Sequence, residues 1–163
     1  MYIQMKVAGL TLDSSSNTPV LLLRDEAEKH LVPIWIGIVE ASAIATELEK
    51  IPIARPMTHD LIKSVVVALG ATVERVEVTD LRDNTYYAAI HMRTAQGVHV
   101  IDARPSDAIA LALRAGANIF VEERVIEKST RGGESPHSGS SDKDKWTEFL
   151  ESLDPEDFGK YKM

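Results

Sequence analysis

The sequence has no cysteine and no long apolar run, and each absence excludes a class of protein. Without cysteine there can be no disulfide bond, thiolate zinc site or cysteine nucleophile. No stretch reaches the roughly 18 apolar residues that a membrane-spanning helix needs. The first residues alternate like a strand instead of forming a basic region and an apolar leader. We therefore expect a cytoplasmic protein with no membrane partner, in which any metal ion has oxygen or imidazole ligands.

Basic residues are outnumbered in the chain. Its 163 residues include 18 Lys and Arg against 25 Asp and Glu, which gives a net charge of −7. Proteins that bind nucleic acid along its backbone carry basic patches, because they displace counterions from the phosphates. The sequence has no such run, so RNA or DNA would be bound weakly, by local contacts or through a divalent cation.

The composition divides the chain into three parts. Residues 1–128 carry the strand and helix patterns of one domain, whereas residues 129–141 are rich in Ser and Gly, as in a flexible linker. Residues 142–163 contain a short amphipathic helix and a tail. The apolar residues of that helix are Trp146, Phe149, Leu150 and Leu153. Because so short a helix is marginal alone, we expect the helix around Trp146 to dock on its own domain or on a sister subunit, with a foreign partner as the alternative.

Within the domain, three strand patterns precede a helix and the arrangement then recurs. The strands are expected at 2–13, 20–23, 31–36, 73–81, 86–93, 98–103 and 119–121, and the helices at 39–50, 58–70 and 105–115. Gly9 marks a bulge, and Pro33 restricts its strand to a sheet edge or a strand start. The order predicts an α+β fold, with helices packed on a mixed, largely antiparallel sheet. It also fits a duplicated strand-strand-strand-helix unit.

Polar side chains gather where the expected helices begin. They are Glu40 at the first helix, Arg55, His59 and Asp60 at the second, and Asp102, Arg104, Ser106 and Asp107 at the third. The unpaired N–H groups and the positive dipole end of a helix N-terminus favour carboxylates and also bind anions. The acids can therefore be simple helix caps or parts of an anion site.

Two of these residues carry further expectations. By alternation Asp102 shares a face with Val98 and Val100, so it is expected to end a buried row and to need a partner. That partner could be an arginine, in a structural ion pair, or a cation. His59 is the preferred histidine because it adjoins Asp60 in a polar helix entry, although an exposed surface histidine is the alternative reading.

Four segments resemble the bifunctional nuclease domain family. They are LVPIWIGIVEASAIA from Leu31, RPMTHDLI from Arg55, the strand pair around DNTYYAAIHM from Asp83, and IDARPSDAIALALR from Ile101, followed by IFVEE. The resemblance covers about residues 1–127, and the FGKYKM ending is similar to an appendage of some bacterial members. It implies an α+β domain that forms a homodimer, and a nuclease that acts on both RNA and DNA. All eight polar residues at the helix starts match the family pattern.

The implied activity narrows the mechanism. An enzyme that cuts DNA cannot rely on a 2′-OH group, so water must attack, activated by a metal ion or a base. We expect two groups of residues, namely Glu40, His59, Asp60, Asp102 and Asp107 as catalytic, and Arg55, Arg104 and Ser106 as phosphate-binding. The carboxylates of Asp102, Asp107, Asp60 and Glu40 are candidate ligands for Mg²⁺ or Mn²⁺. Asp102→Asn and Arg104→Ala are then expected to abolish cleavage, as is EDTA.

Two other classes of function stay open at this point. In the first, the chain is a non-enzymatic binding or regulatory module whose Arg and Asp residues form a structural ion-pair network. In the second, the helix starts recognise a small anionic metabolite.

Overall fold

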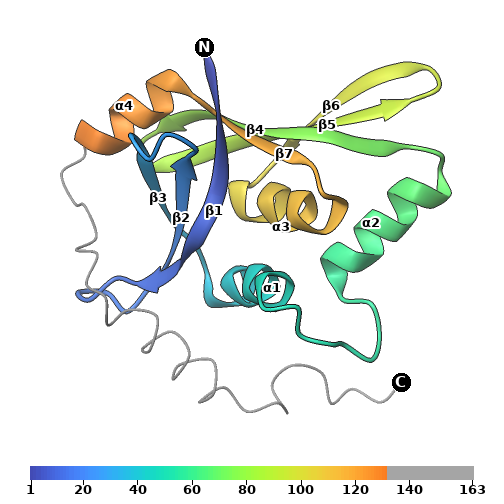
Figure 1. Cartoon of the computed structure of the whole chain (residues 1–163), viewed down its shortest axis with the longest axis horizontal. Helices are drawn as coiled ribbons and strands as arrows, with labels where there is room; N and C mark the ends of the chain where they lie inside the picture. The colour runs from blue at the N-terminus through green and yellow to red at the C-terminus, as the bar shows by residue number, and fades with distance from the viewer. Residues whose placement is uncertain (132–163) are drawn as a thin grey trace.

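Seven strands form one sheet in the structure, a computed structural model that describes residues 1–131 (Figure 1). The strands are β1 (Tyr2–Leu12), β2 (Pro19–Asp25), β3 (Leu31–Trp35), β4 (Thr72–Arg82), β5 (Thr85–Thr94), β6 (Gly97–Ala103) and β7 (Asn118–Glu122). Their order is β3-β2-β1-β7-β4-β5-β6, and only the pair of β4 with β7 is parallel. The sheet is therefore mixed and largely antiparallel, which confirms the predicted α+β class.

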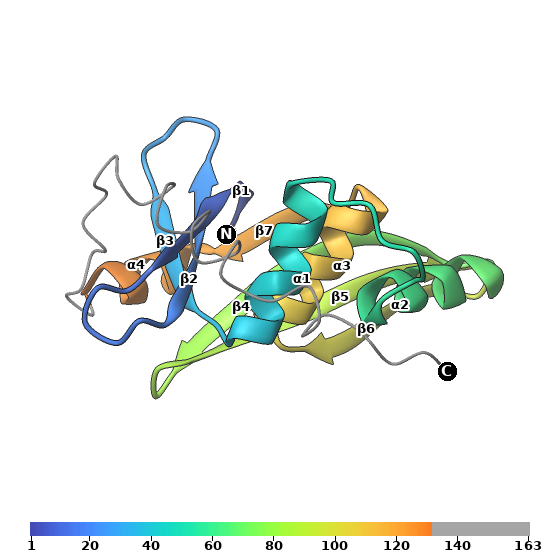
Figure 2. The ribbon, with the colours of Figure 1, turned by 90° about the horizontal axis from the view of Figure 1, so that it is seen from below.

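In the described part of the chain, four helices pack on this sheet. They are α1 (Ile38–Leu48), α2 (Thr58–Ala68), α3 (Pro105–Ala115) and α4 (Glu123–Arg131). The Ala-rich α3 is almost wholly buried, with the sheet on one side and α1 alongside it, as both views show (Figures 1 and 2). Small side chains allow this close approach of α3 to its neighbours. The starts of α1, α2 and α3 thereby come to one region of the molecule.

Local sequence signals in the first strands are confirmed. The register of β1 against β2 shifts between Val7 and Gly9, and Gly9 has a φ of 154°, which favours glycine. Pro33 lies in β3, which is an edge strand of the sheet. Its missing N–H therefore does not interrupt the hydrogen bonds between central strands. β2 is buried along most of its length, as its continuous apolar run indicates.

The expectation of a buried row in β6 is wrong. Val98, Val100 and Asp102 are all exposed. β6 is an edge strand that pairs with β5 alone, and α3 packs on β4, β5 and β7. Alternation identifies which side chains share a face of a strand, but it does not say whether another element covers that face. Asp102 therefore needs no buried partner.

The last element of the described part of the chain is a helix that the sequence patterns did not predict. α4 packs against β3, β4 and β7 through buried Val125 and Ile126. It extends into the expected linker, where the Ser129 hydroxyl donates to the Ile126 carbonyl at 2.8 Å. The helix expected around Trp146 lies outside the described residues, so its docking stays a prediction. Among residues 1–131, no helix is both long and apolar enough to cross a membrane.

Candidate functional site

The side chain of Arg104 is at the centre of the candidate site. Arg104 follows β6 and occupies the N-cap position of α3. Its Nε donates to Asp107 Oδ2 at 2.8 Å, and its Nη1 donates to Glu40 Oε1 at 2.9 Å. These carboxylates raise the pKa of Arg104 further above its ordinary value. The side chain is nevertheless 66% exposed, so a fixed positive charge faces solvent.

Asp107 extends this set of contacts to α2. Its Oδ1 lies 2.9 Å from Nε2 of His59, a buried residue in the first turn of α2. Burial alone would raise the pKa of the Asp107 carboxyl, but the hydrogen bonds from Arg104 and His59 lower it overall. We call Glu40, Arg104, Asp107 and His59 the Arg104 network. It joins the starts of α1, α2 and α3, as the helix-start hypothesis requires.

One further ion pair, with several hydrogen bonds, surrounds Arg114 in the last turn of α3. Arg114 Nε donates to Asp60 Oδ1 at 2.8 Å, and its other nitrogens donate to the carbonyls of Ala43 at 2.9 Å and Ala110 at 3.0 Å. Asp60 also accepts from the backbone N–H of Met57 at 2.9 Å. Burial opposes ionisation of Asp60, but the hydrogen bonds from Met57 and Arg114 lower its pKa overall. The Arg114 side chain is 3% exposed, so this Arg114 network is structural.

Arg114 is not among the site residues predicted from the sequence, although the sequence holds a signal for it. Arg114 is the one charged residue in the last turn of a helix that is apolar nearly all round. A guanidinium on such a helix is buried at a high cost unless it finds a carboxylate or free carbonyls. That rule pointed to an acid on a neighbouring helix, and the structure identifies that acid as Asp60.

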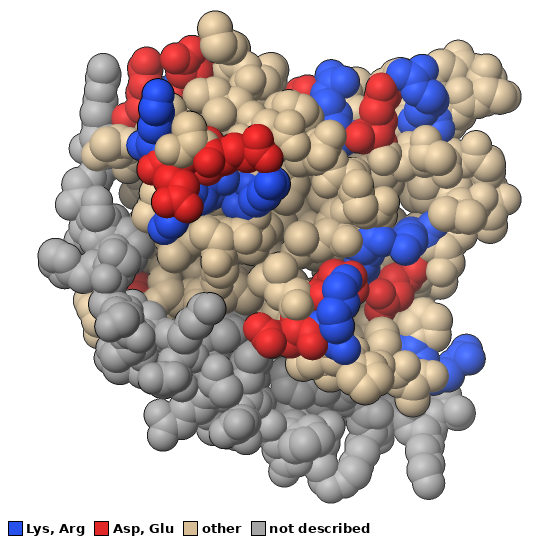
Figure 3. Space-filling model, viewed as in Figure 1, with Lys and Arg blue, Asp and Glu red and all other residues tan. Residues whose placement is uncertain are grey.

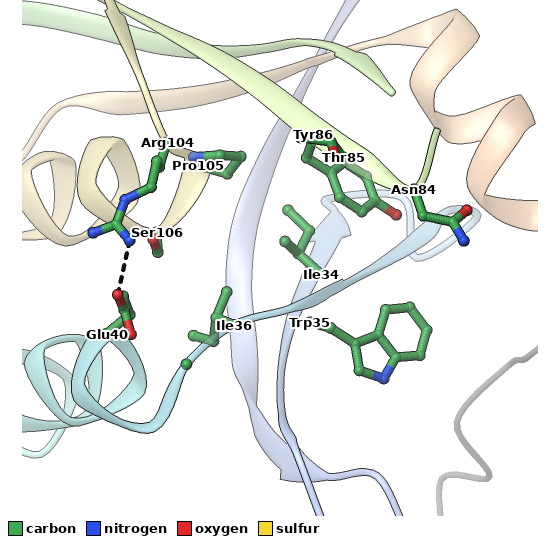
Figure 4. Close-up of a pocket in the computed structure, with 11 residues that line it drawn as sticks. Ile34, Trp35, Ile36, Glu40, Asn84, Thr85, Tyr86, Arg104, Pro105 and Ser106 are labelled. Carbon is green, nitrogen blue, oxygen red and sulfur yellow. Dashed lines mark hydrogen bonds and ion pairs between the residues drawn. The ribbon is translucent and has the colours of Figure 1, made fainter. Parts of the chain in front are cut away.

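A pocket of about 260 Å³ opens beside Arg104 (Figure 4). Its polar end is formed by Glu40, Arg104 and Ser106, of which Glu40 and Arg104 are paired in the close-up. The other lining residues are Ile34, Trp35, Ile36, Gly37, Asn84, Thr85, Tyr86 and Pro105. A Cβ atom on Gly37 would collide with the Glu40 carboxylate. Glycine at position 37 therefore leaves room for Glu40 to reach Arg104.

Two predicted site residues lie outside both networks and outside the pocket. Arg55 and Asp102 are exposed, and the side chain of neither forms a hydrogen bond or ion pair with another residue in the 1–131 range. Of the eight residues named from the sequence, four form the Arg104 network, Ser106 lines the pocket beside it, and Asp60 belongs to the Arg114 network. The roles expected for Arg55 and Asp102 stay predictions.

The described residues contain no ready-made metal site. Within residues 1–131, no three His, Asp or Glu side chains are grouped so that they could hold an ion. Glu40, Asp107 and Asp60 already pair with guanidinium groups. The side chains therefore do not fit a resident metal ion bound by protein ligands alone. Among residues 1–131, Glu40 is the single carboxylate that lines the pocket, so substrate oxygens would have to complete the coordination of a cation bound there.

The distribution of charged side chains on the surface fits a ligand that the protein contacts locally. On the face shown in Figure 3, acidic and basic side chains lie next to each other, and no continuous basic band crosses the described part. An extended backbone-binding groove would need such a band. For binding a negatively charged ligand, the fixed positive charge of Arg104 therefore contributes more than the overall charge of this face.

The fold and the pocket define an α+β domain with an arginine-centred ion-pair network at the meeting point of three helix starts. The chain belongs to the bifunctional nuclease domain family, whose model matches residues 21–132. That match includes the Arg104 network and leaves out β1. It confirms the resemblance recognised from the sequence segments.

Relatives of two kinds match the chain. "Uncharacterized protein Rv1829" of Mycobacterium tuberculosis (strain ATCC 25618 / H37Rv) is 39% identical over 163 residues, which covers 95% of this chain and 97% of the relative. "Bifunctional nuclease 1" of Oryza sativa subsp. indica is 28% identical over 72% of this chain. "Bifunctional nuclease 1" of Arabidopsis thaliana is 26% identical over 77%. This chain spans 40% and 42% of the length of these two plant proteins.

Proposed function

We propose that the chain is a nuclease that hydrolyses phosphodiester bonds of RNA and DNA in the pocket beside Arg104. The supporting observation is the fixed, exposed guanidinium of Arg104 at the rim of a pocket that also contains a carboxylate and a serine. A guanidinium binds two phosphate oxygens at once and stabilises the charge that develops on them during transfer. Membership of the nuclease family and the names of the plant relatives point to the same chemistry.

The polar residues at the Arg104 end of the pocket each have a role in the proposed reaction. The water oxygen bonds to phosphorus, the bond from phosphorus to the leaving nucleoside oxygen breaks, and that oxygen takes up a proton. Arg104 clamps the non-bridging oxygens, and the Ser106 hydroxyl at the start of α3 donates to the same phosphate. Glu40 accepts the proton of the attacking water. Asp107 and His59 are positioning residues, because they hold Arg104 and do not line the pocket.

A divalent cation is expected to enter with the substrate. Mg²⁺ often binds one or two carboxylates together with substrate phosphates and water, and Glu40 is the carboxylate that lines the pocket. Mg²⁺ or Mn²⁺ held there would offset the repulsion between an acidic protein and a polyanion, and would lower the pKa of the attacking water.

The activity is tested by incubating the purified full chain with single- and double-stranded RNA and DNA, in Mg²⁺, Mn²⁺ or EDTA. We expect cleavage of both RNA and DNA with either metal and none in EDTA. RNA fragments should lack 2′,3′-cyclic phosphate ends, because water and not the 2′-OH attacks. Cyclic ends with no DNA cleavage, or intact substrates under every condition, would reject the proposal.

A non-enzymatic binding or regulatory module is the second candidate, favoured by the way the Arg114 network ties three helices together. If the Arg104 network is also only structural, Arg104→Met should lower the melting temperature sharply and the wild type should show no nuclease activity. A thermal-shift screen with phosphates and nucleotides would identify a small anionic ligand, because ligands that bind the native state raise the melting temperature.

The assembly and the location belong to the same proposal. We propose a cytoplasmic homodimer, on which the helix around Trp146 docks. Light scattering on the full chain and on a chain that ends at residue 141 would test this, with a dimer expected for the full chain.

A further inference from the structure

The pocket has an aromatic end that the proposed reaction does not use. Trp35, at the end of β3, and Tyr86, in β5, line it together with Asn84 (Figure 4). Figure 4 shows these side chains on the side of the pocket away from Arg104 and Glu40, with Ile34 and Ile36 in between. A single pocket thus combines a fixed positive charge with aromatic surface.

The structure holds the Trp35 ring in place. Its Nε1–H donates to Asp13 Oδ2 at 2.8 Å, and Asp13 itself accepts from the backbone N–H groups of Ser15 and Ser16 and from the Ser15 hydroxyl. These hydrogen bonds lower the pKa of Asp13, so it stays ionised. Trp35 remains 38% exposed although its polar edge is already satisfied. A tryptophan fixed by its edge and open to solvent is ready to stack against a planar group.

The neighbours of Trp35 are fixed as well. The Tyr86 hydroxyl donates to the Pro33 carbonyl at 2.8 Å, and burial raises the pKa of Tyr86 to about 12, so the ring is neutral. Asn84 lies in the turn between β4 and β5, where Asp83 and Asn84 both have positive φ, of 47° and 58°. Its carboxamide can both donate to and accept from the edge of a base. The aromatic end therefore has a stacking surface and a side chain able to form hydrogen bonds.

The volume of the pocket indicates a small ligand, on the scale of one nucleotide unit. Its volume of about 260 Å³ is below the roughly 300–1,000 Å³ of sites for drug-sized ligands. Bases in a duplex are stacked on each other and cannot enter a side pocket unless they are flipped out at a cost in free energy. Single strands present unstacked bases, which proteins bind on aromatic side chains with little sequence preference.

We propose that Trp35 stacks against one unpaired nucleobase while Arg104 holds the adjoining phosphate, so that the pocket selects single-stranded nucleic acid. This inference rests on the proposed nuclease function, because it assigns the substrate class of that site. It also accounts for binding by a protein with a net charge of −7, since stacking offsets part of the electrostatic repulsion.

The test uses the fluorescence of Trp35 in the full chain. The chain has two tryptophans, so Trp146→Phe leaves Trp35 as the single reporter. This protein is titrated with a thymidine oligonucleotide and with a hairpin duplex, in Mg²⁺ buffer, and the strands are then checked for cleavage on a gel. We expect saturable quenching by the single strand, with at least tenfold weaker binding of the duplex. Equal affinity for the two, or unchanged Trp35 emission, would overturn the inference.

Variants measured by anisotropy of a labelled strand complete the test. Trp35→Leu should weaken single-strand binding about tenfold, and Trp35→Phe should retain most of it, because an aromatic face remains. Tyr87→Leu is the matched control, since Tyr87 is an exposed aromatic residue that does not line the pocket. Equal affinities of Trp35→Leu and Tyr87→Leu, with unchanged melting temperatures, would reject stacking. Binding without cleavage on the gel would reject the nuclease function and leave the stacking site standing.

Discussion

Arg104 directly precedes α3 and Arg114 lies in its last turn, and the two make the same kind of contact but differ in exposure. Each donates its Nε to an aspartate at 2.8 Å, but the Arg104 side chain is 66% exposed and that of Arg114 is 3% exposed. Arg114 also satisfies two backbone carbonyls, whereas Arg104 bridges two carboxylates beside a pocket. The comparison teaches that burial, and not residue type, separates the stabilising guanidinium from the one that can meet a substrate.

The largest effect is expected from Arg114→Met. It leaves Asp60 without its guanidinium and the Ala43 carbonyl without its donor inside the structure. Removing one partner of a buried pair costs about 3–5 kcal/mol of unfolding free energy. Urea unfolding followed by circular dichroism measures the loss. A loss below about 1 kcal/mol would show that the Arg114 network is not a structural tie.

Arg104→Met should have the opposite profile. Exposed ion pairs contribute about 0.2–1 kcal/mol, so stability should change little. Cleavage of DNA should fall about 100- to 1,000-fold, because a charge that stabilises the transition state is removed. Arg93→Met is the matched control, since Arg93 pairs with Glu74 at an exposed position away from the pocket. Equal cleavage rates of the two variants would refute the role of Arg104.

The contribution of the Arg114 network to stability should depend on pH, because Asp60 must be ionised to pair with Arg114. The pKa of Asp60 is lowered in the folded state, so its ion pair contributes fully above the ordinary aspartate value of about 4. That contribution is lost as the pH falls through the lowered pKa of the folded state. The difference in unfolding free energy between wild type and Asp60→Asn should therefore shrink below about pH 4, by up to about 1.4 kcal/mol per pH unit. Urea unfolding over a pH series measures it, and a difference that grows in acid would contradict the assignment.

The smallest effect is expected from Gly37→Ala. The new Cβ would displace the flexible end of Glu40, while Arg104 keeps its bond to Asp107. We expect kcat to fall roughly tenfold, with stability nearly unchanged. This is less than the roughly 100-fold or more that loss of a general base costs, because Glu40 is displaced and not removed. Steady-state kinetics and a melting curve check both expectations. A drop in melting temperature with full activity would mean that Glu40 serves the fold alone.

Elements that depend on local signals could be predicted from the sequence. The bounds of α3 are those expected, because Pro105 starts the helix and Gly116, with a φ of 67°, ends it. The meeting of Glu40, His59 and Asp107 could also be anticipated, because polar residues recur at helix starts.

Elements that depend on distant contacts could not. β7, close to the end of the domain, lies in the middle of the sheet between β1 and β4, and no local pattern encodes that position. The same limit explains the exposed Asp102, whose strand pattern is regular but whose face no helix covers. The aromatic end of the pocket was missed for this reason too, because Trp35 and Tyr86 belong to strands that are far apart in the sequence.

The proposed reaction, in which Glu40 accepts the proton of the attacking water, is tested most directly by the rate at which Glu40→Gln cleaves DNA. Glutamine keeps the shape of Glu40 and still offers an oxygen to Arg104, but it cannot accept the proton of water. We expect Glu40→Gln to cleave at a rate at least about 100-fold below wild type, at an unchanged melting temperature. The control Glu26→Gln changes an exposed ion pair with Lys6 and should cleave at the wild-type rate. Cleavage by Glu40→Gln at the wild-type rate would contradict the proposed reaction.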